Sequence, residues 1–366
     1  MDLNNPNQEA LFPLLYRLLK SDTPLLDVRA AVEFSKGALP CATNLPILND
    51  DERHQVGICY KQEGPQAATK LGHELVKDDT KRQRIEHWAA FVKANPGAWI
   101  YCFRGGQRST IAQRWLAESG IDVPKIDGGY KALRRCLLNL YENLPPLVVV
   151  AGKTGVGKTI LINDVNNSVD LEGRANHRGS AFGNYWTQQP SQIDFENHVA
   201  IDILKSQGRV VLEDEGRLIG KLSLPLPLQA AMKKAPLVLL EASVEERVET
   251  IFQDYIVDSI DSCDEAHDPI QMLETKYLNA LDAVKKRLGG AAYETISSAM
   301  RAAFDDHKKG DPAGHKNWIR SMLVTYYDPM YEYQIQSKQD RIIQRGSMTE
   351  IRAYLAPANL NGISVR

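Results

Sequence analysis

The chain of 366 residues contains no uninterrupted apolar run of the length that a membrane-spanning helix needs, which is about 20 residues. We therefore expect no membrane partner. The first residues include Asp2 and Glu9 and lack the basic segment followed by an apolar core that marks a secretory signal. The five cysteines are scattered, with no CxxC pair and no zinc-ligand spacing, so neither a disulfide framework nor a zinc site is expected. These absences predict a cytoplasmic protein.

The sequence also has little net charge. Its 44 basic and 46 acidic residues leave a formal charge of −2, so no overall field draws the protein to nucleic acid, and any nucleic-acid surface must be a local patch. A hydrophobic content of 43% and a charged content of 25% are ordinary for a globular protein. The length is sufficient for two domains.

Short apolar strands alternate with helix-forming segments in the first part of the chain. Residues 25–29 and 98–101 have the pattern of buried strands, and residues 65–94 are rich in helix formers. This alternation predicts an α/β domain with a parallel sheet. The pair Pro145-Pro146 cannot continue a helix and indicates a domain boundary, so we expect a first domain over residues 1–143.

The remainder, residues 144–366, is predicted to form a second α/β domain. Apolar runs at 147–151, 209–213 and 236–241 have the pattern of buried strands. From about residue 270 onward the composition favours helices. The expected fold is therefore a parallel-sheet domain followed by a P-loop NTPase-like α/β domain with a mainly helical C-terminal part.

One cysteine, Cys102, lies in a loop between a predicted strand and a predicted helix. A thiol at a helix N-terminus is stabilised as the thiolate by the backbone N–H groups. Gly105 and Gly106 let the loop backbone curl around a bound group, and Arg104 and Arg108 add positive charge. This loop suits a thiolate that holds or attacks an anionic substrate. The candidate catalytic residues are thus Cys102, Arg104 and Arg108.

Two other interpretations of this loop are open. Cys102 and Arg108 have the Cys-x5-Arg spacing of cysteine phosphatases. A lone cysteine is also often a small buried side chain without chemistry.

The second functional loop is a Walker A pattern, GxxxxGKT, that follows the apolar strand predicted at 147–151. Its backbone N–H groups would cradle phosphate oxygens, Lys158 would neutralise charge, and Thr159 would bind Mg²⁺. The pattern specifies the bound group and not the reaction, because ATP, GTP or another diphosphate ester fits it equally well. The predicted phosphate-binding residues are Gly152, Lys153, Thr154, Gly155, Val156, Gly157, Lys158 and Thr159.

Acidic residues end the strand predicted at 209–213. One of Glu213, Asp214 and Glu215 could bind the metal as a Walker B residue, and Asp214 is our candidate. Three acids at a strand end can equally be solvated surface, and the sequence does not choose among them.

Two further segments are candidates for substrate contact. Arg174, His177 and Arg178 lie in a stretch rich in glycine and basic residues, which suits phosphate or nucleic acid but also an ordinary basic loop. The C-terminal part combines basic residues with aromatic ones, such as Trp318 and Tyr327, a composition found both in RNA-binding surfaces and in helices with one buried face.

The surroundings of Cys102 resemble the rhodanese domain from end to end. The resemblance is carried by residues 26–29, 37–40, 42–46 and 127–130. A rhodanese-like domain followed directly by a P-loop domain resembles one family, the tRNA 2-selenouridine synthases. Residues 56–64, 152–159, 171–183 and 326–331 extend this resemblance over nearly the whole chain.

The resemblance implies a substrate, donors and a partner. The substrate would be a tRNA that carries a 2-thiouridine wobble base, and selenium would come from selenophosphate. Geranyl diphosphate would first alkylate the sulfur, so that S-geranyl-2-thiouridine is the intermediate. The phosphate-binding loop would hold the diphosphate, and the Cys102 loop would receive selenium. Selenophosphate synthetase is a candidate partner.

The sequence leaves two other functions open. The first is a P-loop kinase or NTPase with an appended sulfurtransferase domain. The second is a non-catalytic regulator that binds RNA or nucleotide.

Overall fold

The computed structural model describes residues 10–263 and 268–356, and these form two compact units. The first unit extends to Asn143 and includes Ser191–Lys205, and the second takes Leu144–Pro190 and the chain from Ser206 onward. The predicted division assigned residues 191–205 to the second domain. In the structure this segment packs on the first unit, where the Tyr141 hydroxyl donates to the carbonyl of Glu196 at 2.7 Å.

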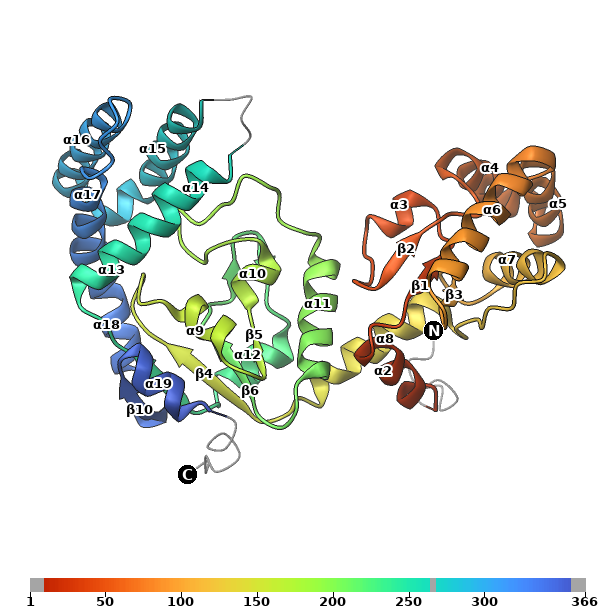
Figure 1. Ribbon diagram of the computed structural model, residues 1–366, viewed down its shortest axis with the longest axis horizontal. Coiled ribbons are helices and arrows are strands. Elements are labelled where there is room, and N and C mark those ends of the chain that lie inside the picture. Colours follow the sequence, from red (N-terminus) through yellow and green to blue (C-terminus); the bar gives the residue numbers. More distant parts are fainter. Residues whose placement is uncertain (1–9, 264–267, 357–366) are drawn as a thin grey trace. The chain divides into compact units, whose positions relative to one another are not determined.

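The first unit is built on a parallel sheet with the strand order β2-β1-β3. Its strands are β1 (Leu25–Asp27), β2 (Ala42–Asn44) and β3 (Trp99–Tyr101). Leu26 and Ile100, adjacent in the sheet, are fully buried, because helices cover the sheet (Figure 1). The helices are α2 (Phe12–Lys20), α3 (Ala31–Phe34), α4 (Asp50–Glu63), α5 (Pro65–Leu75), α6 (Asp78–Ala94), α7 (Gln107–Glu118), α8 (Gly129–Glu142) and α11 (Gln192–Lys205).

The second unit has a larger parallel sheet with the order β10-β9-β4-β6-β5. Its central strands are buried along their whole length, as their apolar runs predict. The strands are β4 (Leu147–Ala151), β5 (Ser168–Val169), β6 (Val210–Glu213), β9 (Leu237–Leu240) and β10 (Ile342–Gly346), with a separate antiparallel pair β7 (Leu218–Ile219) and β8 (Leu222–Ser223).

Short helices follow the strands of this sheet, and a mainly helical part follows β9 (Figure 1). The predicted fold class, α/β with a mainly helical C-terminal part, is confirmed. The helical elements are α9 (Lys158–Asp164), α10 (Leu171–Ala175), α12 (Leu226–Met232), α13 (Val244–Ile251), the π-helix η1 (Phe252–Val257), α14 (Asp258–Asp261), α15 (Pro269–Leu288), α16 (Gly290–His307), α17 (His315–Met322), the π-helix η2 (Leu323–Tyr327), α18 (Asp328–Gln336), η3 (Gln339–Arg341) and α19 (Met348–Tyr354).

The C-terminal aromatic residues are largely core residues. Trp318 and Tyr327 are 3% and 8% exposed and pack in one cluster with Tyr277 and Phe304. Of the two interpretations that the sequence leaves open, the buried helix face holds for Trp318 and Tyr327, because the helices turn those residues inward.

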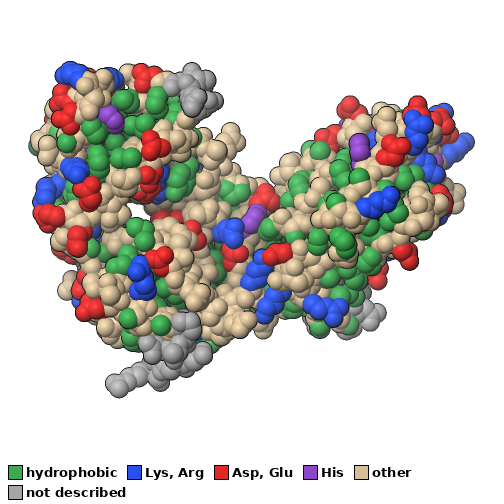
Figure 2. Space-filling view, viewed as in Figure 1, with side chains coloured by type: hydrophobic (Ala, Val, Ile, Leu, Met, Phe, Trp, Pro, Cys, Tyr) green, Lys and Arg blue, Asp and Glu red, His purple; other side chains and the backbone are tan. Residues whose placement is uncertain are grey.

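The basic residues of the same part are mostly paired with acids. Lys308 lies 2.6 Å from Glu274, and Arg320 lies 2.7 Å from Glu245. On the face drawn in Figure 2, basic and acidic side chains are interspersed. Among the described residues, no helix is both long enough and apolar enough to cross a membrane.

Candidate active sites

The Cys102 loop is held by backbone contacts with the start of α8. The N–H groups of Tyr130 and Lys131 donate to the carbonyl oxygens of Cys102 at 2.9 Å and Phe103 at 3.0 Å. Gly105 has a φ of +64°, and a Cβ atom there would lie 2.6 Å from the carbonyl oxygen of Ile126. Only glycine fits this close approach, so the loop shape depends on it.

The Cys102 thiol is 3% exposed and lies at the amino end of α7. Its Sγ is 3.2 Å from the hydroxyl of Ser109, which belongs to the first turn of that helix. The Ser109 hydroxyl is also 3.1 Å from the carbonyl of Gly106. The structure therefore places the sulfur at the helix N-terminus that the sequence predicts, where negative charge is stabilised.

The two arginines of the loop differ. Arg108 is bound by Glu33, with nitrogen–oxygen distances of 2.5 and 3.1 Å, and Arg53 approaches the same carboxylate at 3.2 Å. Burial would raise the pKa of Glu33, but Arg108 outweighs it and lowers that pKa. Arg104 is exposed, and no described residue pairs with it. Arg108 thus fixes the loop, while Arg104 is the charge that remains open to a ligand.

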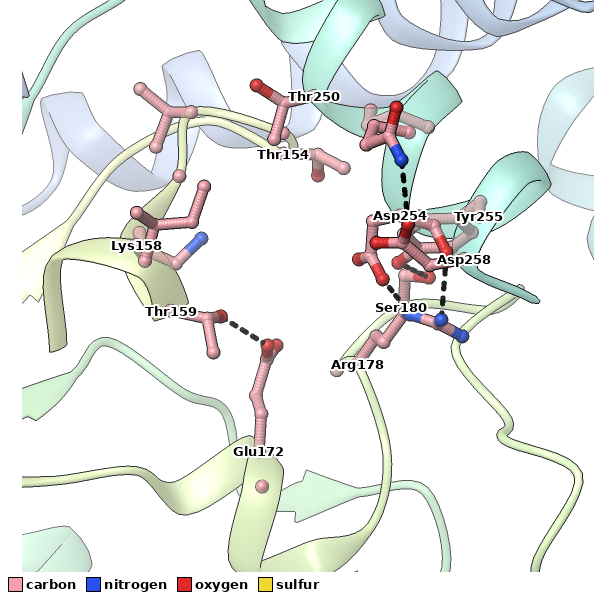
Figure 3. Close-up of a pocket in the computed structure, with 18 of the residues that line it drawn as sticks. Thr154, Lys158, Thr159, Glu172, Arg178, Ser180, Thr250, Asp254, Tyr255 and Asp258 are labelled. Carbon is pink, nitrogen blue, oxygen red and sulfur yellow. Dashed lines mark hydrogen bonds and ion pairs between the residues drawn. The ribbon is translucent and has the colours of Figure 1, made fainter. Parts of the chain in front are cut away.

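The phosphate-binding loop lies between β4 and α9, as the Walker A context requires. Gly155 has a φ of +78°, and a Cβ there would lie 2.9 Å from the carbonyl oxygen of Arg247. The loop borders a cavity of about 820 Å³. Figure 3 shows Lys158 and Thr159 on one side of this cavity and Asp254 and Tyr255 on the other.

A buried ion pair connects this loop to the helical part. Arg247, on α13, is 2% exposed and donates through Nε to the carbonyl of Thr154 at 2.9 Å. Its two Nη atoms donate to the carboxylate of Asp328 at 2.6 and 3.1 Å. Asp328 opens α18 and also lies 3.7 Å from Lys153. The segment 326–331, singled out in the sequence, therefore supports the shape of the phosphate-binding loop.

Of the three acids that the sequence leaves open as metal ligands, Glu215 faces the loop, whereas Asp214, our candidate, does not. Asp214 is paired with Lys338 at 2.5 Å and does not line the cavity. Glu172 accepts a hydrogen bond from the Thr159 hydroxyl at 3.0 Å, and Glu215 lines the same cavity. Glu213 is fully buried and accepts from the N–H of Leu171. Sequence reasoning missed Glu172, because nothing in the pattern links it to Thr159.

The acids around the cavity favour a divalent cation. Burial raises the pKa of Glu172, and burial together with the neighbouring Glu172 carboxylate raises the pKa of Glu215 to about 8. Carboxylate and hydroxyl oxygens are the ligands that Mg²⁺ prefers, so Thr159, Glu172 and Glu215 fit such an ion together with a phosphate group. Among the described residues, no cluster of three or more His, Cys, Asp or Glu forms a metal cage. The acidic lining residues are Asp170, Glu172, Glu215, Glu246, Glu249, Asp254 and Asp258.

Lys158 carries the main positive charge on the loop side. Burial would lower its pKa, but Tyr331, Glu172 and Glu215 outweigh burial and raise it. Lys158 therefore remains a cation that can neutralise a phosphate oxygen.

The three basic candidates of the segment 171–183 occupy different places. Arg178 lines the cavity, is paired with Asp254 at 2.7 Å, and stacks on Tyr185 at 4.1 Å. His177 is buried, and its Nδ1 accepts from the N–H of Gly179 at 3.1 Å. Arg174 is exposed on α10 and does not line the cavity. Of the three, only Arg178 lines the cavity beside the phosphate-binding loop.

Comparison with known proteins covers both units. Residues 13–136 match the rhodanese-like domain, and residues 145–361 match the tRNA 2-selenouridine synthase AAA domain. The chain belongs to the tRNA 2-selenouridine synthase family. The resemblance stated from the sequence is thereby confirmed.

Named relatives of the family span almost the whole chain. The tRNA 2-selenouridine synthase of Photobacterium profundum is 46% identical over 93% of this chain and 96% of its own length. That of Pseudomonas putida (strain W619) is 46% identical over 94% and 97%, and that of Marinobacter nauticus is 47% identical over 90% and 93%. The family likeness therefore includes the Cys102 loop and the phosphate-binding loop together.

Proposed function

We propose that this protein replaces sulfur by selenium at C2 of a 2-thiouridine wobble base in tRNA. Selenophosphate supplies selenium, selenophosphate synthetase delivers it, and S-geranyl-2-thiouridine is the intermediate. The observation that carries the proposal is the pairing of two unlike sites in a member of this family. One is a cysteine at a helix N-terminus with the open charge of Arg104, and the other is a cavity at a phosphate-binding loop.

The first step belongs to the phosphate-binding loop. The thiouridine sulfur attacks C1 of geranyl diphosphate, so that an S–C bond forms and the C–O bond to the diphosphate breaks. The electron pair leaves with the diphosphate, and the base loses its N3 proton to solvent. Lys158 and the loop N–H groups bind the diphosphate oxygens and stabilise the charge that develops on them. Mg²⁺, held by Thr159, Glu172 and Glu215, would add Lewis-acid stabilisation of that leaving group.

The second step belongs to the Cys102 loop. Selenium of selenophosphate attacks C2, a C–Se bond forms, and the C–S bond breaks with its electron pair leaving on geranylthiolate. Water then cleaves the Se–P bond and releases inorganic phosphate, so no oxidant or reductant is consumed. Arg104 and the N-terminus of α7 hold the donor anion, and the sulfur of Cys102 positions its selenium for the attack on C2. Alkylation helps because an alkylated sulfur leaves as a thiolate, whereas the sulfur of a thiocarbonyl does not.

The rival function is a P-loop kinase or NTPase with an appended sulfurtransferase domain. The cavity of about 820 Å³ is large enough for a nucleotide as well as for a prenyl diphosphate. The two functions differ in turnover. Rapid ATP hydrolysis by the purified protein without tRNA would support the rival and contradict our proposal.

The proposal is tested by Lys158→Ala. Loss of this ammonium group should lower the rate of geranyl transfer to 2-thiouridine RNA by at least about 100-fold, because one preorganised charge on a leaving group contributes about that much. Lys233→Ala, which removes an exposed lysine at the end of α12, is the matched control. Mass spectrometry of the nucleosides measures the S-geranyl product. Wild-type amounts of that product in Lys158→Ala would rule out this role of the loop.

A further inference from the structure

The first unit contains an apolar cavity directly beside the Cys102 loop. Its volume is about 110 Å³, and Gln107 and Arg108, the first residues of α7, belong both to its wall and to the loop. Ile47, Val76 and Trp115 form its buried side. These three residues belong to the same cluster of buried residues as Cys102. The wall of the cavity and the cysteine are therefore parts of one hydrophobic core.

Helices α4 and α5 form the other walls of this cavity. Val56 and Tyr60 come from α4, and Ala68 and Gly72 come from α5. The hydroxyl of Thr69, also on α5, lies 3.2 Å from the side-chain amide of Gln107. This contact connects α5 to the start of α7, so the cavity opens next to the loop that receives the donor.

Gly72 keeps this cavity open. A Cβ atom at residue 72 would meet only a methyl group of Val56, at 3.8 Å, which is an ordinary contact. Glycine inside a helix lowers helix stability relative to alanine. No steric demand explains glycine here, and its effect is to leave space next to the Cys102 loop.

The lining does not suit the charged reactants. Selenophosphate is an anion, and the sugar–phosphate backbone of RNA is polar. Contact with an apolar wall therefore contributes no favourable binding free energy for either of them. An apolar chain does bind favourably there, because the transfer of each methylene group from water into an apolar cavity lowers the free energy. An apolar cavity of about 150 Å³ in another protein binds benzene, so the volume beside Cys102 suits an isoprene-sized group. In the proposed reaction sequence, the geranyl chain on sulfur is the apolar group that reaches this loop.

We propose that this cavity binds one isoprene unit of the geranyl chain of S-geranyl-2-thiouridine and thereby places C2 of the base at the Cys102 loop. This inference rests on the proposed function. It makes the geranyl group a recognition element for the selenation step as well as part of the leaving group. A 2-thiouridine that has not been alkylated lacks this contact, so the Cys102 site selects the product of the first step.

The test fills the cavity without disturbing the fold. Gly72→Leu adds a side chain toward the cavity, and leucine is a better helix former than glycine. Gly57→Leu is the matched control, because residue 57 lies in α4, is exposed, and a Cβ there meets nothing within 4 Å. Both full-length variants are given selenophosphate and anticodon stem-loop RNA that carries S-geranyl-, S-dimethylallyl- or S-methyl-2-thiouridine, and 2-selenouridine is measured by mass spectrometry.

The wild-type protein and Gly57→Leu should convert the S-geranyl RNA at least about tenfold more efficiently than the S-methyl RNA, since one missing methylene in an apolar pocket already changes specificity by about tenfold or more. Gly72→Leu should lose this preference while it converts the S-methyl RNA like wild type. Its transfer of geranyl from geranyl diphosphate to 2-thiouridine RNA should be unchanged, which also shows that the variant is folded.

Different failures have different meanings. If wild type forms no 2-selenouridine from any alkylated RNA, the proposed function itself is wrong. If wild type selenates alkylated RNA but treats the three alkyl groups alike, or if Gly72→Leu keeps the wild-type preference, the assignment of the cavity is wrong and the proposed function stands.

Discussion

At the scale of single residues, the two loops carry different chemistry and should be separable. Cys102 lies against Ser109 at the N-terminus of α7, in a unit that does not contain the phosphate-binding loop. Each loop also depends on a charged residue that is held by its neighbours: Arg108 is bound by Glu33, and Arg247 donates to the carbonyl of Thr154. Substitution of Cys102 or Lys158, which would contact the reactants, is therefore the informative change, because substitution of the supporting arginines would also alter the loop.

Cys102→Ser should abolish formation of 2-selenouridine while S-geranyl-2-thiouridine still forms and accumulates. The smaller oxygen of serine cannot replace the sulfur that positions the selenium donor, and the phosphate-binding loop is untouched. Cys41→Ser is the control, because burial raises the pKa of Cys41 to about 11 and keeps it a neutral thiol. Nucleoside mass spectrometry of tRNA from a deletion strain that expresses each variant measures both products. Unchanged selenouridine in Cys102→Ser would contradict the role of this sulfur.

Much of the site could be predicted at this scale, and the failures have physical causes. The positions of Cys102 and of Lys158 follow from local motifs, in which a strand, a loop and a helix are adjacent in sequence. Glu172 lies 13 residues after Thr159 and reaches it only through the tertiary fold. Asp214 forms an ion pair with Lys338, which is 124 residues away in sequence, and so does not face the cavity. Contacts of this kind are set by packing, and a single sequence does not contain them.

At the scale of elements, strands were predicted where apolar runs are long. β4 has the predicted bounds, Leu147–Ala151, because a central strand of a parallel sheet is buried on both faces. β10 was missed, since Ile342–Gly346 alternates partly buried with exposed positions at the sheet edge and ends in Arg345 and Gly346. α11 was assigned to the second domain, because its return to the first unit depends on long-range bonds such as that from Asn197 to the carbonyl of Ala38.

The helices α16 and α17 are joined by a hydrogen-bonded chain of rings. The indole N–H of Trp318 donates to Nδ1 of His315 at 2.9 Å, so the proton of neutral His315 lies on Nε2. That Nε2 is 3.1 Å from Nδ1 of His307 and donates to it. Protonation of His315 at Nδ1 would break the bond from Trp318, and His315 is completely buried. This chain therefore requires His315 to be neutral.

The fold should accordingly lose stability in mild acid. Burial and the neighbouring His307 lower the pKa of His315 from 6.5 to about 4. Between these values the unfolded chain binds more protons than the folded one, so this contribution is complete above about pH 6.5 and declines as the pH falls toward 4. The loss amounts to about 3 kcal/mol, from 1.36 kcal/mol for each pKa unit.

The measurement is the pH dependence of the unfolding temperature. His315→Gln keeps an acceptor for Trp318 and a donor for His307 but does not titrate, so its unfolding temperature should fall less between pH 7 and pH 5 than that of wild type. His54→Gln, at an exposed position of α4, should follow wild type. Equal slopes for wild type and His315→Gln would show that another group causes the acid sensitivity.

At the scale of the whole molecule, the described residues of each proposed site lie within one unit. The contacts that shape the Cys102 loop come from Glu33, Ser109, Lys125 and Tyr130, all in the first unit. The residues that line the cavity of the phosphate-binding loop all belong to the second. A defect in one site should therefore leave the other intact, and the two proposed steps should be able to occur on different protein molecules.

A mixture of two inactive variants tests this independence. Lys158→Ala alone should make neither product from 2-thiouridine RNA, and Cys102→Ser alone should stop at the S-geranyl product. Mixed in equal amounts with geranyl diphosphate and selenophosphate, they should form 2-selenouridine after a lag, because the RNA must leave one molecule and bind the other. Supplying S-geranyl RNA to Lys158→Ala should remove the lag. If Lys158→Ala converts supplied S-geranyl RNA but the mixture yields no 2-selenouridine, the RNA passes between the sites without release, and the two steps are coupled within one molecule.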